Sequence, residues 1–185
     1  MAAGDGVRQA LNAGTRRVFF ALWPDARVRA GLAQAARRMH RVSHGQRTGD
    51  ENIHLTLAFV GAVDTENLAR LLRPPPEVFT SGFLLTLDDW GCWVRNGIGW
   101  AAPSHIPEPL RDLTANLEGW LRGAGFELEH RPFAPHVTLV RKAQCVPLPD
   151  AMTPVEWRVE EFALIHSRLT PGGARYETLR AWPLG

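Results

Sequence analysis

The chain has 185 residues, which is enough for one domain to bury a core without disulfides or metal ions. With 45% hydrophobic and 22% charged residues it has the composition of a globular protein, and no apolar run approaches the roughly 20 residues of a membrane-spanning helix. The net charge is only +2 and there is no basic block, so charge by itself does not indicate a nucleic-acid partner.

The N-terminal segment and the two cysteines indicate where the protein works. Residues 1–16 hold scattered Gly, Ala and Arg without the apolar stretch of a signal peptide, so we expect a flexible tail before a single domain over 17–185. Cys92 and Cys145 form no C-x-x-C motif, and we expect unpaired filler residues in the reducing cytoplasm. The sequence therefore predicts a cytoplasmic protein without membrane association.

In the first half of the chain, segments whose apolar residues are spaced as in strands alternate with segments whose apolar residues are spaced as in helices. Short apolar runs predict strands, whereas apolar residues at helical spacing against arginines predict an amphipathic helix. The expected elements are a strand over 17–23, a helix over 25–40, a polar loop over 42–52, a strand over 53–60 stopped by Gly61, and a short helix capped by Asp64 or Thr65 that ends before the prolines at 74–76.

The second half has a similar order and ends in several strands. Turn-forming residues divide it into short segments. The expected elements are strands over 83–87 and 98–102 that form a hairpin through the turn 88–97, a helix over 108–122, and strands over 136–141, 156–167 and 174–182.

A four-residue pattern marks the same place in each half. His54-Leu55-Thr56-Leu57 and His136-Val137-Thr138-Leu139 both alternate polar and apolar residues, so in a strand the His and Thr share one face. Each motif follows the predicted end of a helix at the same separation along the chain. Two strand–helix–strand units related by an approximate twofold axis would bring both motif strands to the centre, which predicts an α+β fold with a central groove and outer helices.

Two histidines that face one groove form an acid/base pair. One can take a proton from an attacking water while the other protonates a departing oxygen, as an in-line displacement at phosphorus requires. Thr56 and Thr138 can donate hydrogen bonds to the non-bridging phosphate oxygens. The chain has no dense Cys/His/Asp/Glu set for zinc and no Gly-x-Ser-x-Gly elbow, so we expect neither a metal nor another cofactor.

The motifs and their flanking residues resemble one enzyme family. The chain resembles the two-histidine phosphoesterases in both motifs and in several flanking segments. These are the strand over 17–22, the flanks over 51–61 and 131–141, and a tail with Ser167, Tyr176 and Trp182. Within that superfamily the chain resembles the RNA 2′,3′-cyclic phosphodiesterases, also called 2′-5′ RNA ligases. The resemblance covers 17–184 and implies a bilobal α+β fold.

The resemblance also implies a reaction and its residues. It implies hydrolysis of an RNA-terminal 2′,3′-cyclic phosphate to a 2′-phosphate, with a possible reverse ligation, by His54 as proton donor and His136 as acceptor. Arg141 is a candidate phosphate ligand if a bulge or strand end turns it into the groove; Arg131 could line the groove; and Phe59, Trp93 and Trp100 could stack on a base or pack in the core. We expect a monomer that acts on RNA ends, with fragments like tRNA halves as candidate substrates.

Two other functions remain open at this stage. One is an RNA-end-binding protein without turnover, against which two titrating groups argue. The other is a phosphodiesterase for small cyclic nucleotides.

Overall fold

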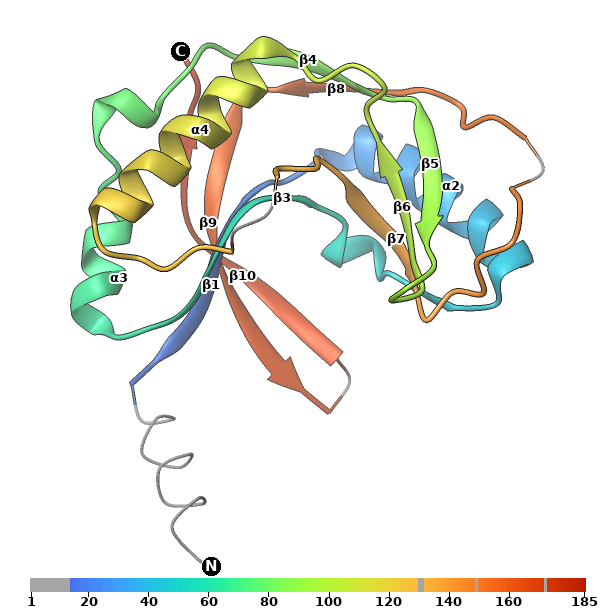
Figure 1. The fold of residues 1–185 in the computed structure, drawn as a ribbon, viewed down its shortest axis with the longest axis horizontal. Helices are drawn as coiled ribbons and strands as arrows, with labels where there is room; N and C mark the ends of the chain where they lie inside the picture. The colour runs from blue at the N-terminus through green and yellow to red at the C-terminus, as the bar shows by residue number, and fades with distance from the viewer. Residues whose placement is uncertain (1–13, 130–131, 149, 172) are drawn as a thin grey trace, which may run out of the picture.

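The computed structural model describes residues 14–129, 132–148, 150–171 and 173–185. The described residues form three α-helices, ten strands and two short 3-10 helices (Figure 1). The helices are α2 (Ala26–Ser43), α3 (Thr65–Leu71) and α4 (Glu108–Gly123), and the 3-10 helices are η1 (Asp50–Asn52) and η2 (Pro76–Val78). The strands are β1 (Arg16–Leu22), β2 (Gln46–Arg47), β3 (Leu55–Val63), β4 (Phe83–Leu87), β5 (Asp89–Trp93), β6 (Ile98–Ala102), β7 (Val137–Arg141), β8 (Val155–Val159), β9 (Glu161–Thr170) and β10 (Gly173–Pro183).

The two motif strands lie side by side in the middle of the main sheet. Its order is β10-β9-β1-β3-β7-β6-β5, with β2 added beside β7, and the strand pairs are antiparallel. Strands β3 and β7 meet through a single residue pair, Leu55 with Val137. The α+β class and the central place of the motif strands are thus confirmed, whereas the division into two lobes stays a prediction.

Each long helix packs on the strands of the other half. Helix α2 follows β1 but lies on β7 and β8 (Figure 1). Its Met39 sulfur occupies the space that a side chain at Gly99 of β6 would need. Helix α4 follows β6 but packs on β3, and its Trp120 ring meets Phe20 of β1 edge-on at 6.0 Å. The two halves therefore share one hydrophobic core.

The helix starts are close to those expected from the sequence. The Asp25 side chain caps α2 by accepting a 2.8 Å hydrogen bond from the Val28 amide, and Asp64 caps α3 through Asn67 in the same way. None of the described helices is long and apolar enough to cross a membrane. Residues 1–13 of the expected tail lie outside the described residues, and β1 begins at Arg16.

The predicted hairpin between 83–87 and 98–102 is wrong. Strand β6 pairs with β5, and the turn is only the four residues 94–97, while β4 pairs with β8 in a separate two-stranded sheet. Strand β5 was not predicted because Gly91 interrupts its alternation of polar and apolar residues. A side chain at position 91 would clash with the Trp100 ring, so the structure requires glycine there. The predicted strand over 156–167 is likewise two strands, β8 and β9, separated at Glu160.

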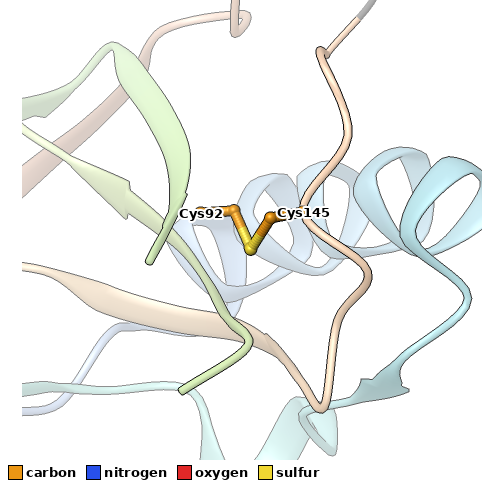
Figure 2. Close-up of a disulfide and its surroundings, with 2 residues drawn as sticks. All are labelled: Cys92 and Cys145. Atoms are coloured by element: carbon orange, nitrogen blue, oxygen red, sulfur yellow. A yellow bond between two sulfur atoms is a disulfide. The ribbon is translucent and has the colours of Figure 1, made fainter. Parts of the chain in front are cut away.

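The expectation of two unpaired cysteines is also wrong. Cys92 of β5 and Cys145 beyond β7 form a disulfide (Figure 2). Their Cα atoms are 5.5 Å apart, and the two residues are 53 positions apart in the sequence. Cysteines this distant along the chain carry no local signal of pairing, which the fold alone creates. The bond ties the β5–β6 hairpin to the segment that follows β7.

Candidate active site

The register at the sheet centre brings the two motifs together. Leu55 and Val137 are paired and fully buried, so the residues on either side of each project from the opposite face. In an antiparallel pair the residue before one partner faces the residue after the other. His54 therefore lies beside Thr138, and His136 beside Thr56.

All four motif side chains line one cavity of about 680 Å³. Arg141 and Phe59, two residues predicted to bind substrate, line the same cavity. Arg131 lies outside the described residues. An adjoining, more apolar cavity of about 530 Å³ shares Thr56, Phe59, Trp93 and His136 with the first. The structure thus brings together six of the seven residues predicted to form the site.

Both imidazoles are oriented by the backbone in the same way. Nδ1 of His54 lies 2.7 Å from the Asn52 carbonyl oxygen, and Nδ1 of His136 lies 2.8 Å from that of Ala134. A carbonyl can only accept, so each Nδ1 carries a proton and the nitrogen that can exchange one is Nε2. Nε2 of His54 lies 3.1 Å from the Thr56 hydroxyl, which donates to it when the ring is neutral.

His54 is enclosed by aromatic rings. Trp23 stacks on it with ring centroids 5.3 Å apart and only 5° between the planes, while Phe19 and Tyr176 approach at steeper angles. Burial among these neighbours lowers the pKa of His54 from 6.5 to about 4, against the hydrogen bond to Asn52, which raises it. The positive charges of Arg141 and His136 lower this pKa further.

A β-bulge brings Arg141 into the cavity. Thr138 is opposite Trp100 of β6, but Val140 is opposite Gly99, so Leu139 is an extra residue in β7. Leu139 and Val140 are both buried as a result, and Arg141 returns to the face of Thr138. This is the bulge that the sequence analysis required if Arg141 was to reach phosphate.

The first motif has the same irregularity. Thr56 is opposite Ala21 of β1 and Ala58 is opposite Phe20, so Leu57 is the extra residue. Phe59 consequently faces the cavity and keeps 49% of its surface exposed. A second irregularity lets β3 continue through Gly61, at a φ of 91°, where the sequence analysis expected the strand to stop.

The other aromatic candidates have different positions. Trp93 lines both cavities and contacts the His136 ring edge-on at 4.6 Å, whereas Trp100 packs behind Trp93. Trp23 and Tyr176 were not predicted as neighbours of His54, because nothing in the sequence near either residue indicates that contact. Among the described residues, no three His, Cys, Asp or Glu side chains converge as if to hold a metal ion.

The chain resembles known proteins over most of its length. The family model described as LigT-like phosphoesterase matches residues 22–100 and again 101–176, so that each match contains one motif. The RNA 2′,3′-cyclic phosphodiesterase of Escherichia coli strain K12 is 33% identical over 170 residues, which are 91% of this chain and 97% of that protein. The enzyme of the same name from Thermus thermophilus is 29% identical over 91% of this chain and 90% of its own length.

Solved structures also resemble this fold over most of the chain. The apo crystal structure of E. coli LigT superposes with a TM-score of 0.82 at 32% identity, covering 92% of this chain and 98% of its own. The crystal structure of E. coli LigT complexed with 3′-AMP gives the same TM-score, identity and coverage.

Proposed function

The chain belongs to the LigT-like phosphoesterase family, and we propose that it hydrolyses the 2′,3′-cyclic phosphate at an RNA end to a 2′-phosphate. The observation that carries the proposal is the pairing of two His-x-Thr motifs across one cavity that also holds Arg141. The 3′-AMP complex of E. coli LigT supports a nucleotide ligand for this fold.

The two histidines divide the proton transfers between them. Nε2 of His136 accepts a proton from water while the water oxygen bonds to phosphorus, the P–O3′ bond breaks, and O3′ takes a proton from Nε2 of His54. The products are a 2′-phosphate and a free 3′-hydroxyl. The bonds from Nδ1 to backbone carbonyls support these roles, because they make Nε2 the nitrogen of each ring that exchanges protons with substrate. The assignment of His54 as donor and His136 as acceptor rests on the family resemblance.

The remaining side chains act on the negative charge of the phosphoryl group. Thr56 and Thr138 donate hydrogen bonds to its non-bridging oxygens, and the Arg141 guanidinium supplies a positive charge. These groups are held before substrate arrives, since both motif strands lie in the middle of the sheet. The reaction needs no metal ion in this proposal.

His54 receives its proton together with the substrate. With a pKa of about 4 it is neutral near pH 7 in the free protein. A bound anionic phosphate favours the imidazolium and offsets the charge of Arg141. The donor is thus charged only in the complex, beside the oxygen that it protonates.

The same site could also ligate RNA ends by the same displacement with a different nucleophile. A 5′-hydroxyl in place of water would attack the cyclic phosphate, and loss of O3′ would leave a 2′-5′ linkage. We also propose that the protein is a monomer and acts on RNA in the cytoplasm.

Hydrolysis of an oligonucleotide that ends in a 2′,3′-cyclic phosphate tests the proposal. We expect turnover in the presence of EDTA, and a loss of about 10²-fold or more in His54→Ala and in His136→Ala. Nearly full activity in either variant would rule out the acid/base pair, and loss of activity with EDTA alone would require a metal.

The same assay separates the two alternatives. Tight binding of the RNA end without turnover at any pH would identify a binding protein, whereas a bell-shaped pH–rate profile identifies the enzyme. Faster turnover of a mononucleotide than of the oligonucleotide would identify a phosphodiesterase for small cyclic nucleotides.

A further inference from the structure

The two motif histidines have different neighbours at equivalent positions. Leu22 of β1 is opposite Leu55, so the next residue, Trp23, comes opposite His54. Ala101 of β6 is opposite Val137, so the next residue, Ala102, comes opposite His136. An indole stacks on the first imidazole, whereas the second half offers only a methyl group there. The pseudo-symmetry of the site is broken at this position.

The backbone around Trp23 is fixed on both sides. It follows the last residue of β1 and precedes Pro24, which is buried and whose carbonyl oxygen accepts a 3.1 Å hydrogen bond from Arg29 of α2. Asp25 then caps α2. A side chain anchored by a strand and a helix start is a rigid surface for another ring.

We propose that Trp23 is a positioning residue for His54, whose indole holds the plane of the imidazole and keeps water from its face. The two hydrogen bonds of His54 direct its nitrogens, but hydrogen bonds tolerate deviations of some tens of degrees, so they limit the tilt of the ring plane only loosely. A parallel ring at 5.3 Å opposes that tilt, which the edges of Phe19 and Tyr176 do less well. The kinetic part of this inference rests on the proposed function; the structural part does not.

Water exclusion by Trp23 also bears on when His54 is charged. The groups that can carry charge and line the same cavity as His54 are Arg17, Glu127, Glu129, His136, Arg141 and Tyr176, and Arg47 lines a smaller adjoining cavity with it. Burial is the largest cause of the lowered pKa of His54, ahead of Arg141 and His136. Removing the indole opens one face of the ring to water and leaves those charges in place.

NMR titration of the His54 ring protons tests the structural part without any substrate. In Trp23→Ala we expect the midpoint to rise by about one pH unit or more, toward the ordinary value for His. Trp23→Phe keeps a flat ring and is expected to retain a low midpoint. Trp120→Ala is the matched control, because it removes an indole that packs on Phe20 and should leave the His54 midpoint unchanged.

Kinetics test the positioning part. We expect Trp23→Ala to lower kcat on the cyclic phosphate about 10-fold to 100-fold with a smaller change in KM, and Trp23→Phe to restore most of the loss. Should Trp23→Ala not fold, Trp23→Leu keeps the apolar volume without the flat ring and is expected to lose kcat similarly.

Two results would overturn the inference. One is an unchanged His54 midpoint together with unchanged kcat in the Ala or Leu variant, and the other is a Phe variant as defective as Ala. A wild-type protein that titrates as expected but does not hydrolyse the substrate would instead refute the proposed function and leave the contact intact.

Discussion

Phe59 and Arg141 occupy equivalent positions in the two halves of the sheet, and each is turned into the same cavity by a β-bulge at the leucine that ends its motif. In a regular strand, residues three apart point to opposite faces, so neither side chain could reach the groove beside its threonine. The duplicated irregularity places an aromatic ring at one end of the histidine pair and a cation at the other.

Arg141 is predicted to act on the charge of the phosphoryl group. Arg141→Gln keeps a hydrogen-bonding side chain but removes the charge, and we expect kcat/KM for the cyclic phosphate to fall about 10²-fold. Arg141→Lys should recover part of this loss, because it restores the charge without the planar fork. Arg111→Gln on the exposed side of α4 is the matched control, and an equal effect in the control would contradict the prediction.

Phe59 is predicted to hold a base of the RNA. Stacking of an aromatic ring on a base contributes about 1–3 kcal/mol, so Phe59→Ala should raise KM for an oligonucleotide about 10-fold while kcat changes little. Leu84→Ala removes a similarly exposed apolar side chain far from the groove and should leave both constants unchanged. A loss confined to kcat in Phe59→Ala would argue against a stacking role.

The donor and acceptor roles can be separated with a better leaving group. In a substrate whose bridging 3′ oxygen is replaced by sulfur, the departing thiolate needs no protonation. We expect this substrate to restore most of the activity of His54→Ala and almost none of that of His136→Ala. The measurement is kcat of each variant on the oxygen substrate and on the sulfur substrate. Rescue of His136→Ala instead would reverse the assignment.

The lowered pKa of His54 makes the stability of the protein depend on pH. An unfolded His takes up a proton near pH 6.5, whereas folded His54 does so near pH 4, so the unfolded state binds more protons between these values. The stabilising effect of the neutral ring is therefore complete above pH 6.5 and declines as the pH falls toward 4.

Urea unfolding at a series of pH values checks this dependence. Between pH 6.5 and 4 we expect the wild type to lose up to about 3 kcal/mol more than His54→Gln. His105→Gln changes an exposed histidine and should follow the wild type. Parallel curves for wild type and His54→Gln would show that His54 titrates normally.

The disulfide is predicted to stabilise the fold. A bond that closes 53 positions of chain contributes about 4 kcal/mol by restricting the unfolded state. We expect Cys92→Ser and reduced wild type to unfold at lower urea concentration than the oxidised protein, by comparable amounts. Identical midpoints with and without reductant would show that the bond has no such role.

Most of the elements and the central site were readable from the sequence. The helical spacing and the acidic caps indicated the starts of α2 and α3 to within a residue, whereas α2 runs three residues beyond its expected end at His40. The strand period placed the His and Thr of each motif on one face. The duplicated order of elements then indicated that the two motif strands lie at the centre of the sheet. These features depend on periodicity within a segment, which a sequence displays directly.

The tertiary structure alone decided which segments meet. Three contacts join residues whose sequence neighbours do not indicate the pairing. They are the pairing of β4 with β8, the disulfide between Cys92 and Cys145, and the stack of Trp23 on His54. The bulges at Leu57 and Leu139 likewise exist only relative to the strands alongside. A periodic pattern assigns the two faces of a segment but not the partner of each face, so two similar histidine motifs acquired different surroundings only when the chain folded.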